Sequence, residues 1–391
     1  MLWFLVVIPS AFGIMLLLAV FALPQELVSQ YIYAFSLPGM AWVFGLAGVL
    51  FLAIGIGSWK MRERAQSQLE STFAHSCRDL GQLADTIGRL FLDDRVCFHA
   101  LVGIVLLAIV GRVVFLFQPI RYDEAVTLIE FAAESFSAVI SDYHVPNNHV
   151  FHTVLVFICY RLFGDQPWII RLPAFFSGVV LVPVSFLLGQ VLYNRATGLL
   201  TASLVATSPL LIDYSTNARG YMLVTLLFVL LLFLSAYVRR QQNRVAWLLI
   251  SILASLGFWT IPVMLYPFGI VMLWLLFSNL AGDADSPRRA AITRRVIISA
   301  IFTSLLTVLL YLPVFLNSGV GSVIANPFVS PVSWTEFLTD LPLSLLSTWK
   351  HWTVSLPSFL VVVLFLGTVI SVLFHGRLVS HRMPILVAVI V

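Results

Sequence analysis

Two adjacent carboxylates, Asp123 and Glu124, follow directly on an apolar segment in the sequence Arg121-Tyr122-Asp123-Glu124. An ionisable group near the depth of a bilayer is costly, and such groups tend to mark a substrate path or a reactive centre. The alternative is an ordinary solvated loop, where charges beside the ends of membrane spans commonly lie. The chemical interpretation gains weight because polar groups gather again at two later points of the chain.

The first of these stretches, residues 144–152, reads His-Val-Pro-Asn-Asn-His-Val-Phe-His. Its histidines either serve a site or are interfacial residues that reach headgroups or cap a helix. Asn147 and Asn148 follow a proline, so they also suit an ordinary turn and helix N-cap. His149 and His152 lie three residues apart without a companion motif such as HExxH, so no metal site is predicted.

The second stretch runs from Asp213 to Tyr221 and contains Ala218-Arg219-Gly220. Arg219 opens a long apolar helix, where a cation is poorly placed unless an anion meets it. A lipid headgroup phosphate and a substrate phosphate are both suitable partners for a guanidinium, and the sequence leaves this choice open.

The elements that must position these residues are membrane helices. The chain of 391 residues is 60% hydrophobic and 10% charged. At ~20 residues per crossing it holds about eleven or twelve apolar segments, which predicts an all-α polytopic membrane protein. The expected segments are 1–22, 34–57, 98–117, 149–163, 168–190, 196–212, 217–238, 246–260, 261–280, 296–315 and 354–375, with a last one that begins at Pro384. The first lacks a basic start and a cleavage site, so we expect a retained span. The last is still apolar at Val391, so the chain is expected to be truncated.

The distribution of basic residues predicts the orientation. They gather at 60–95, 239–244, 288–295 and 377–382, which the positive-inside rule places in the cytoplasm. The loops 118–148, 212–217 and 316–353 then face outward. A full crossing by 149–163 would move the cluster at 239–244 outside, so we expect a short, partly inserted or re-entrant helix there.

Residues 62–97 form the one sizeable polar region, with apolar residues at near-helical spacing. This pattern predicts an amphipathic linker helix on the cytoplasmic leaflet. The formal charge of +4 lies in short clusters between spans, so no nucleic-acid partner is expected. Cys77, Cys97 and Cys159 show no CxxC spacing and predict no disulfide framework.

Four motifs in order resemble the GT-C glycosyltransferases, with the bacterial relatives of protein O-mannosyltransferases and aminoarabinose transferases as the nearest group. They are Tyr122-Asp123-Glu124-Ala125, Pro146-Asn147-Asn148-His149, Arg171-Leu172-Pro173-Ala174 and Ala218-Arg219-Gly220-Tyr221, together with the run from Phe163 to Trp168. The resemblance covers residues 98–240 by motif and 240–391 by architecture. The chain departs from the family in its extra N-terminal hairpin and in Asn217, where many relatives carry an acidic residue or glutamine.

The resemblance implies transfer of a sugar from a polyprenyl-phosphate carrier to a lipid, glycan or protein acceptor on the outer membrane face. A hydroxyl acceptor needs a base opposite the leaving group, and Asp123 is the expected base, with Glu124 orienting it or the sugar. A cation should follow the charge that grows on the leaving phosphate, with Arg219 preferred over Arg171 or Lys350. The expected substrate-binding residues are Arg121, Tyr122, His144, Asn147, Asn148, His149, Arg171, Arg219 and Tyr221. No cofactor is required by this scheme, and a divalent cation stays open.

The predicted organisation has four parts: a two-span hairpin at 1–58, a cytoplasmic linker at 59–97, a GT-C core at 98–315, and a second outer loop with C-terminal spans at 316–391. Trp334, Trp349 and Trp352 in that loop are either interfacial anchors or parts of a lid that closes over the donor. The expected location is the inner (plasma) membrane, with the active site outside. The alternatives are a transporter or flippase of a lipid-linked substrate and a non-catalytic lipid-binding scaffold. Transporters usually show paired interrupted helices, whereas these polar residues gather in outer loops.

Overall fold

A computed structural model describes residues 2–21, 40–60, 62–280, 286–324, 332–353 and 357–375. The described chain is built of helices and contains no strand, which confirms the predicted all-α class. It divides into two compact units, residues 1–82 and 83–391, and each is described by itself. The predicted four-part organisation stays a prediction, because this division falls inside the helix that occupies the predicted linker.

The first unit is built on a helical hairpin of α1 (Leu2–Phe21) and α3 (Met40–Lys60). Small residues bring the two backbones together: a Cβ added at Gly13 would lie 2.8 Å from the Gly48 carbonyl oxygen. The ring centroids of Phe12 and Phe51 lie 5.1 Å apart in an edge-on contact. Such close approach through small residues is the usual packing between helices in a membrane.

The predicted amphipathic helix is present as α4 (Arg62–Leu92), which crosses the boundary between the units. It ends where Asp94 begins the next helix, α5 (Arg95–Leu116). The Asp94 carboxylate accepts from the backbone N–H groups of Val96 and Cys97 at 3.0 and 3.1 Å, a regular N-cap. The apolar span therefore starts three residues earlier than expected from hydropathy.

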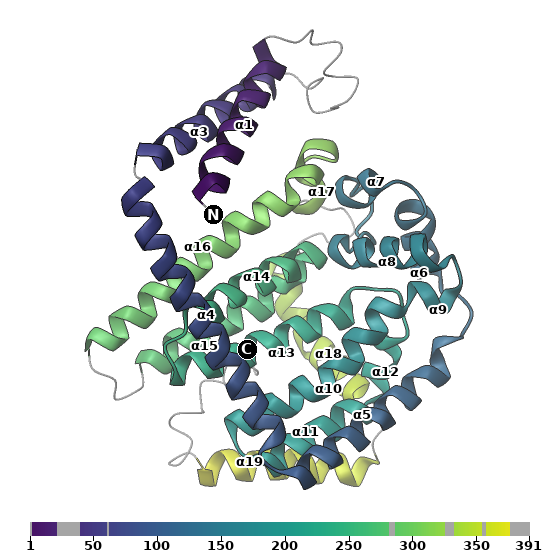
Figure 1. The fold of residues 1–391 in the computed structure, drawn as a ribbon. Helices are drawn as coiled ribbons and strands as arrows, with labels where there is room; N and C mark the ends of the chain where they lie inside the picture. The colour runs from purple at the N-terminus through teal and green to yellow at the C-terminus, as the bar shows by residue number, and fades with distance from the viewer. Residues whose placement is uncertain are drawn as a thin grey trace. The chain divides into compact units, whose positions relative to one another are not determined.

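The core of the second unit is a series of neighbouring helices in which α10 (Leu172–Leu192) packs against α13 (Tyr221–Arg240) and α13 against α14 (Arg244–Thr260) (Figure 1). Helix α11 (Arg195–Thr207) covers the far side of α10, and α16 (Ser286–Asn317) covers the far side of α14. Among the four described helices long and apolar enough to cross a membrane, α13 is the most enclosed, with 72% of its most apolar stretch buried inside the protein. Helix α5 also packs against α10 and α11.

A bend of 61° separates α11 from α12 (Pro209–Ser215). The buried Arg112 of α5 holds this bend. Its guanidinium donates to the Ser215 hydroxyl at 3.0 Å and to the carbonyl oxygens of Ala206 and Val205 at 3.1 and 3.3 Å. Those carbonyls belong to the C-terminal turn of α11, where the helix dipole favours a cation. Sequence reasoning missed Arg112, although an arginine inside an apolar span is itself a signal.

The polar loops contain short helices that the sequence did not resolve. They are α6 (Tyr122–Val126), a π-helical turn η2 (Thr127–Ala132), α7 (Phe136–Ser141) and α9 (Pro167–Ile170). Helix α8 (Val150–Phe163) corresponds to the short helix expected at 149–163. With 14 residues, α8 is about 21 Å long and shorter than a ~30 Å hydrocarbon core. This length suits the predicted partial insertion, which stays a prediction.

Two predicted loops are largely helical where the structure describes them. The basic residues at 288–295 lie within α16 instead of before it, since arginine and alanine are good helix formers. The predicted outer loop 316–353 contains α17 (Gly321–Ile324) and α18 (Trp334–Thr353). The remaining helices are η3 (Pro262–Met264), α15 (Leu265–Leu280) and α19 (Ser358–His375), and the expected segment from Pro384 lies outside the described residues.

By length and composition, four described helices can cross a membrane, or five if the bent pair α11–α12 counts as one span. Six shorter apolar helices of 10–17 residues accompany them. The expected eleven or twelve segments are thus a mixture of full-length and short helices. The apolar helices support a multi-pass membrane protein, as predicted.

Candidate active site

The side chains of Asp123 and Glu124 lie in different environments. Glu124 is fully buried, whereas Asp123 is exposed. The Glu124 carboxylate forms a two-pronged ion pair with Arg171, with Nε to Oε1 at 2.7 Å and Nη2 to Oε2 at 2.6 Å. It also accepts the backbone N–H groups of Ala218 at 2.7 Å and Arg121 at 2.9 Å. Each Glu124 oxygen therefore has two donors.

Arg171 is equally saturated. Beyond its two bonds to Glu124, its guanidinium donates to the carbonyl oxygens of Leu116, Gln118 and Pro119 at 2.8, 2.7 and 2.9 Å. All five N–H groups of the side chain are thereby used. The pair fastens the end of α5, the start of α6 and the turn before α13 to the start of α10. This explains why Arg171 and Glu124 carry no open polar group toward a substrate.

Among the described residues, the Asp123 carboxylate accepts one side-chain hydrogen bond. The Asn147 amide donates to its Oδ1 at 3.4 Å, a long hydrogen bond. The main chain of Asp123 is fixed more firmly, because its carbonyl oxygen accepts the Thr127 hydroxyl at 3.0 Å. The helix then continues into the π-helical turn η2, a rare local geometry that often accompanies functional sites.

Arg121 and Tyr122 lie at the outer edge of the site. Arg121 Nη2 donates to Asp213 Oδ1 at 2.6 Å, and both side chains are partly exposed. This hydrogen bond with Asp213 raises the pKa of Arg121, which stays charged. Tyr122 is 83% exposed and has no fixed role in packing.

The loop at 142–148 contributes three predicted residues in three different environments. Asn148 is buried and structural, because its amide donates to the carbonyl oxygens of Val139 and Asp142 at 2.9 and 2.7 Å. His144 is exposed, with Nδ1 2.8 Å from the Asp142 carboxylate. Asn147 is the member of the group that reaches Asp123.

His149 joins this loop to the turn before α13. Its Nδ1 accepts the backbone N–H of Gly220 at 2.8 Å, and its ring meets that of Tyr221 edge-on at 5.0 Å. A Cβ at Gly220 would lie 2.5 Å from Thr260 Cγ2 and 3.1 Å from the His149 ring, so this close approach requires glycine. Burial and the nearby Arg219 cation hold the pKa of His149 well below its usual value. The histidine is therefore a neutral acceptor.

Arg219 is 5% exposed and, unlike Arg171, its Nε and Nη1 have no protein partner among the described residues. Its guanidinium carbon lies 5.6 Å from the centre of the Tyr221 ring, a cation–π contact. His152, one helical turn beyond His149, is fully buried, and neither of its ring nitrogens has a hydrogen-bond partner among the residues that the structure describes. Buried polar groups normally have hydrogen-bond partners. The Arg219 guanidinium and the His152 ring are therefore available to bind a polar ligand or water.

The predicted residues thus gather at one end of the second unit. The hydrogen bond between Glu124 and the Ala218 N–H brings the segment with Asp123 next to the segment with Arg219. Lys350, the weaker alternative cation, lies on α18 and has no described contact with this group. Within the described residues, no three or more His, Cys, Asp or Glu side chains are grouped so that they could hold a metal ion.

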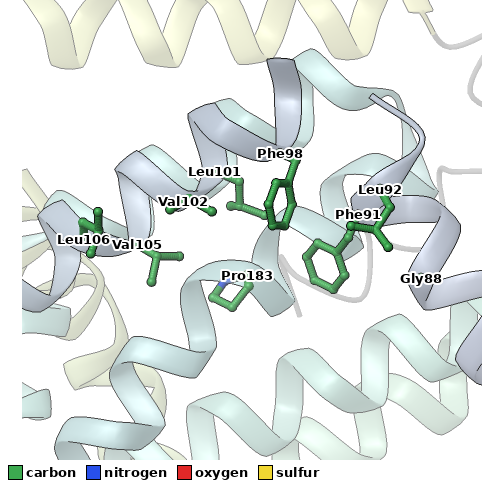
Figure 2. Close-up of a pocket in the computed structure, with 9 residues that line it drawn as sticks. All are labelled: Gly88, Phe91, Leu92, Phe98, Leu101, Val102, Val105, Leu106 and Pro183. Carbon is green, nitrogen blue, oxygen red and sulfur yellow. The ribbon is translucent and has the colours of Figure 1, made fainter. Parts of the chain in front are cut away.

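An apolar pocket of about 390 Å³ lies elsewhere in the second unit, between the end of α4, α5 and α10 (Figure 2). Phe91, Phe98 and Pro183 are among its lining residues, and none of the nine carries a titratable group. This pocket offers no acid, base or phosphate-binding group, so it is not a candidate for the reaction.

A comparison with protein families matches residues 150–311 to the model described as dolichyl-phosphate-mannose-protein mannosyltransferase. No curated protein and no solved structure matches the chain. The matched segment begins at α8 and includes Arg171, Arg219 and Tyr221, whereas Asp123 and Glu124 precede it. The match confirms the resemblance to the GT-C glycosyltransferases. Residues 150–311 are similar to this mannosyltransferase family, and the similarity supports a membrane glycosyltransferase of the GT-C type.

Proposed function

We propose that the chain transfers a sugar from a polyprenyl-phosphate carrier to an acceptor hydroxyl, with Asp123 as the base and Arg219 as the phosphate-binding cation. The observation that carries this proposal is the 2.7 Å hydrogen bond from the Ala218 N–H to Glu124. It joins the segment that holds an exposed carboxylate to the segment that holds a buried guanidinium, whose Nε and Nη1 have no partner in the part of the chain that the structure describes.

The reaction is a single displacement with inversion at the anomeric carbon. The acceptor oxygen forms the new bond to this carbon, and its proton passes to the Asp123 carboxylate. The bond from the anomeric carbon to the phosphate oxygen breaks, and its electron pair leaves with the carrier phosphate. Arg219 stabilises the charge that grows there, and it does so best where water is excluded.

Glu124 and Arg171 act in this scheme as positioning residues. Their donors and acceptors are occupied by each other and by the main chain, so neither offers a free group to a substrate. This assignment moves Glu124 and Arg171 from the substrate side to the support of Asp123 and Arg219. Asn147 holds the Asp123 carboxylate from the opposite loop, and His149 holds the turn that carries Arg219.

Transfer assays with Asp123→Asn test the base. The first donor to try is polyprenyl-phosphate mannose, because the matched family is described by that sugar; other polyprenyl-phosphate sugars follow. We expect turnover to fall by at least ~10²-fold with donor binding retained, the usual scale for a positioned base. Asp165→Asn changes an exposed carboxylate in another loop and is the matched control. Near-normal turnover in Asp123→Asn would remove the mechanism.

We also propose that this site lies on the outer face of the inner (plasma) membrane. The support is the sequence distribution of basic residues, with clusters at 239–244 and 288–295 opposite the site. Single cysteines at 123 and at 242, in a chain without its native cysteines, should label from outside and from the cytoplasm respectively. Labelling of position 123 from the cytoplasm would invert the proposed orientation.

A further inference from the structure

A groove of about 590 Å³ lies between α14 and α16, away from the candidate active site. Helix α13 runs from Tyr221, next to Arg219, to Arg240, and α14 begins at Arg244. A helix of this length extends about 30 Å, so the start of α14 and Arg219 lie near opposite ends of α13. The groove is therefore separate from the site assigned to sugar transfer.

The two helices of the groove run in the same direction. The hydroxyls of Ser251 and Ser299 lie 2.7 Å apart, and the Ser255 hydroxyl donates to the Thr303 carbonyl at 3.2 Å. Both pairs are separated by 48 residues, which fixes a parallel register. Positions near the start of α14 therefore lie beside the basic turn of α16.

Because of this parallel register, three arginines lie at one end of the groove. Arg244, Arg294 and Arg295 all line it. Asn243 caps the start of α14, where its side chain accepts the Ala246 N–H at 2.8 Å, and the positive end of the helix dipole adds to the field. Arg295 Nη1 also donates to Gln242, which holds it at this end. The charge is thus concentrated at the level of the start of α14.

The rest of the groove is apolar and open to the surroundings. Its walls are Leu248, Ile298 and Phe302, which are 47%, 56% and 41% exposed. Trp247 lines the same groove at 7% exposure, and its indole N–H has no protein partner among the described residues. A buried indole N–H usually finds an acceptor, so an oxygen-bearing group is expected beside it.

We propose that this groove binds one anionic phospholipid, with its phosphate at the arginines and an acyl chain along Leu248, Ile298 and Phe302. The combination of a cationic end and an apolar track matches an amphiphile with a negative headgroup, and basic pockets between membrane helices bind such lipids. A zwitterionic lipid would place a second, positive group among the arginines. A soluble phosphate would leave the apolar walls uncovered. The site does not depend on the proposed transfer reaction.

Binding of fluorescent phosphatidylglycerol to the purified, lipid-depleted full chain tests this proposal, with phosphatidylcholine and glycerol phosphate as competitors. We expect phosphatidylglycerol to bind the wild-type chain, and neither competitor to displace it at equal concentration. Arg294→Gln/Arg295→Gln should weaken binding roughly 10- to 30-fold, as expected for two cations at a headgroup. Arg89→Gln/Arg95→Gln removes the same charge from exposed residues outside the groove and should leave the affinity within about 2-fold.

A second variant tests the proposal even if the Arg294→Gln/Arg295→Gln protein does not fold. Ile298→Trp narrows the apolar track at an exposed position and leaves all three arginines in place. It should also weaken phosphatidylglycerol binding by at least ~5-fold if the acyl chain lies there. Unchanged binding in Ile298→Trp would overturn the proposal, and so would an equal loss in the control double variant. Displacement by glycerol phosphate alone would overturn it as well, in favour of a soluble anion.

Discussion

Arg171 and Arg219 are both buried arginines near Glu124, and their environments are opposite: Arg171 pairs with this carboxylate, whereas Arg219 follows Ala218, whose backbone N–H donates to it. Arg171 is fully buried and uses all five N–H groups on Glu124 and on three carbonyl oxygens. Arg219 is 5% exposed, and no described residue pairs with its Nε or Nη1. The difference separates a cation that holds the fold from a cation that is available to a ligand.

The same distinction divides the carboxylates. Glu124 receives four donors and lies inside the protein, whereas Asp123 is exposed and receives one long hydrogen bond from Asn147. The buried pair Glu124–Arg171 thus forms a support, and Asp123 with Arg219 forms the working side. A substitution that leaves a buried partner without its counter-charge should reduce stability. A substitution of a residue that binds a ligand should reduce only function.

The largest effect is expected for Arg171→Gln. This change leaves the Glu124 carboxylate buried without its cation, which costs about 3–5 kcal/mol. We expect a strong loss of monodisperse protein and a lower thermal unfolding temperature in detergent. Arg161→Gln changes an exposed arginine that donates to the Glu134 carbonyl and should change stability little. An Arg171→Gln protein that folds normally but no longer binds donor would turn Arg171 into a substrate ligand and end the comparison.

Arg219 should behave in the opposite way. Arg219→Gln removes a buried charge without orphaning a carboxylate, so the unfolding temperature should stay equal or rise. Transfer should fall by about 10²–10³-fold, as when one preorganised group at a developing anion is removed. Arg219→Lys should recover only part of this loss, since an ammonium cannot replace a two-pronged guanidinium. Full activity in Arg219→Lys, measured at several donor concentrations, would instead indicate a headgroup anchor.

The turn that carries Arg219 is tested by Gly220→Ala. The new methyl group would lie 2.5 Å from Thr260 Cγ2, so we expect a cost of about 1–3 kcal/mol from overpacking. Because Gly220 also donates to His149, transfer should fall together with stability. Gly269→Ala on α15 is the matched control, since nothing lies within 4 Å of its added Cβ. It should be neutral or slightly stabilising. Equal unfolding temperatures in Gly220→Ala and Gly269→Ala would contradict this prediction, because the turn could then shift to make room for the added methyl group.

Much of the fold follows from the sequence. Hydropathy predicts the membrane class and the approximate position of the spans, although α5 begins at Arg95, three residues before the expected segment 98–117. Helix ends were less accurate: the basic turn at 288–295 belongs to α16, because hydropathy alone does not register the helix propensity of arginine.

The roles within the site could not be predicted, because they depend on contacts between distant residues. Asp123 and Glu124 are adjacent, and only the partners of Glu124, 47 and 94 residues further along the chain, decide which one faces inward. Arg171 and Arg219 each stand at the start of an apolar helix, so position in the sequence could not show that Arg171 is the one that pairs with Glu124. Arg112 was overlooked for the same reason: its acceptors lie about a hundred residues away, at the bend before α12.

The smallest effect is expected for the partly exposed pair of Arg121 and Asp213, which extends the comparison to a third arginine. Its ion pair is short, at 2.6 Å, but the two side chains are 35% and 50% exposed. Solvent and salt weaken such pairs, so the double-mutant cycle of Arg121→Gln and Asp213→Asn should give a coupling of about 0–1 kcal/mol that shrinks at high ionic strength. The backbone N–H of Arg121 would still donate to Glu124 in each variant, so the buried support stays intact. Transfer should therefore fall far less than in the Arg219 variants. A coupling well above 1 kcal/mol, or a loss of transfer as large as that of Arg219→Gln, would place Arg121 with the ligand-binding cations instead of at the edge.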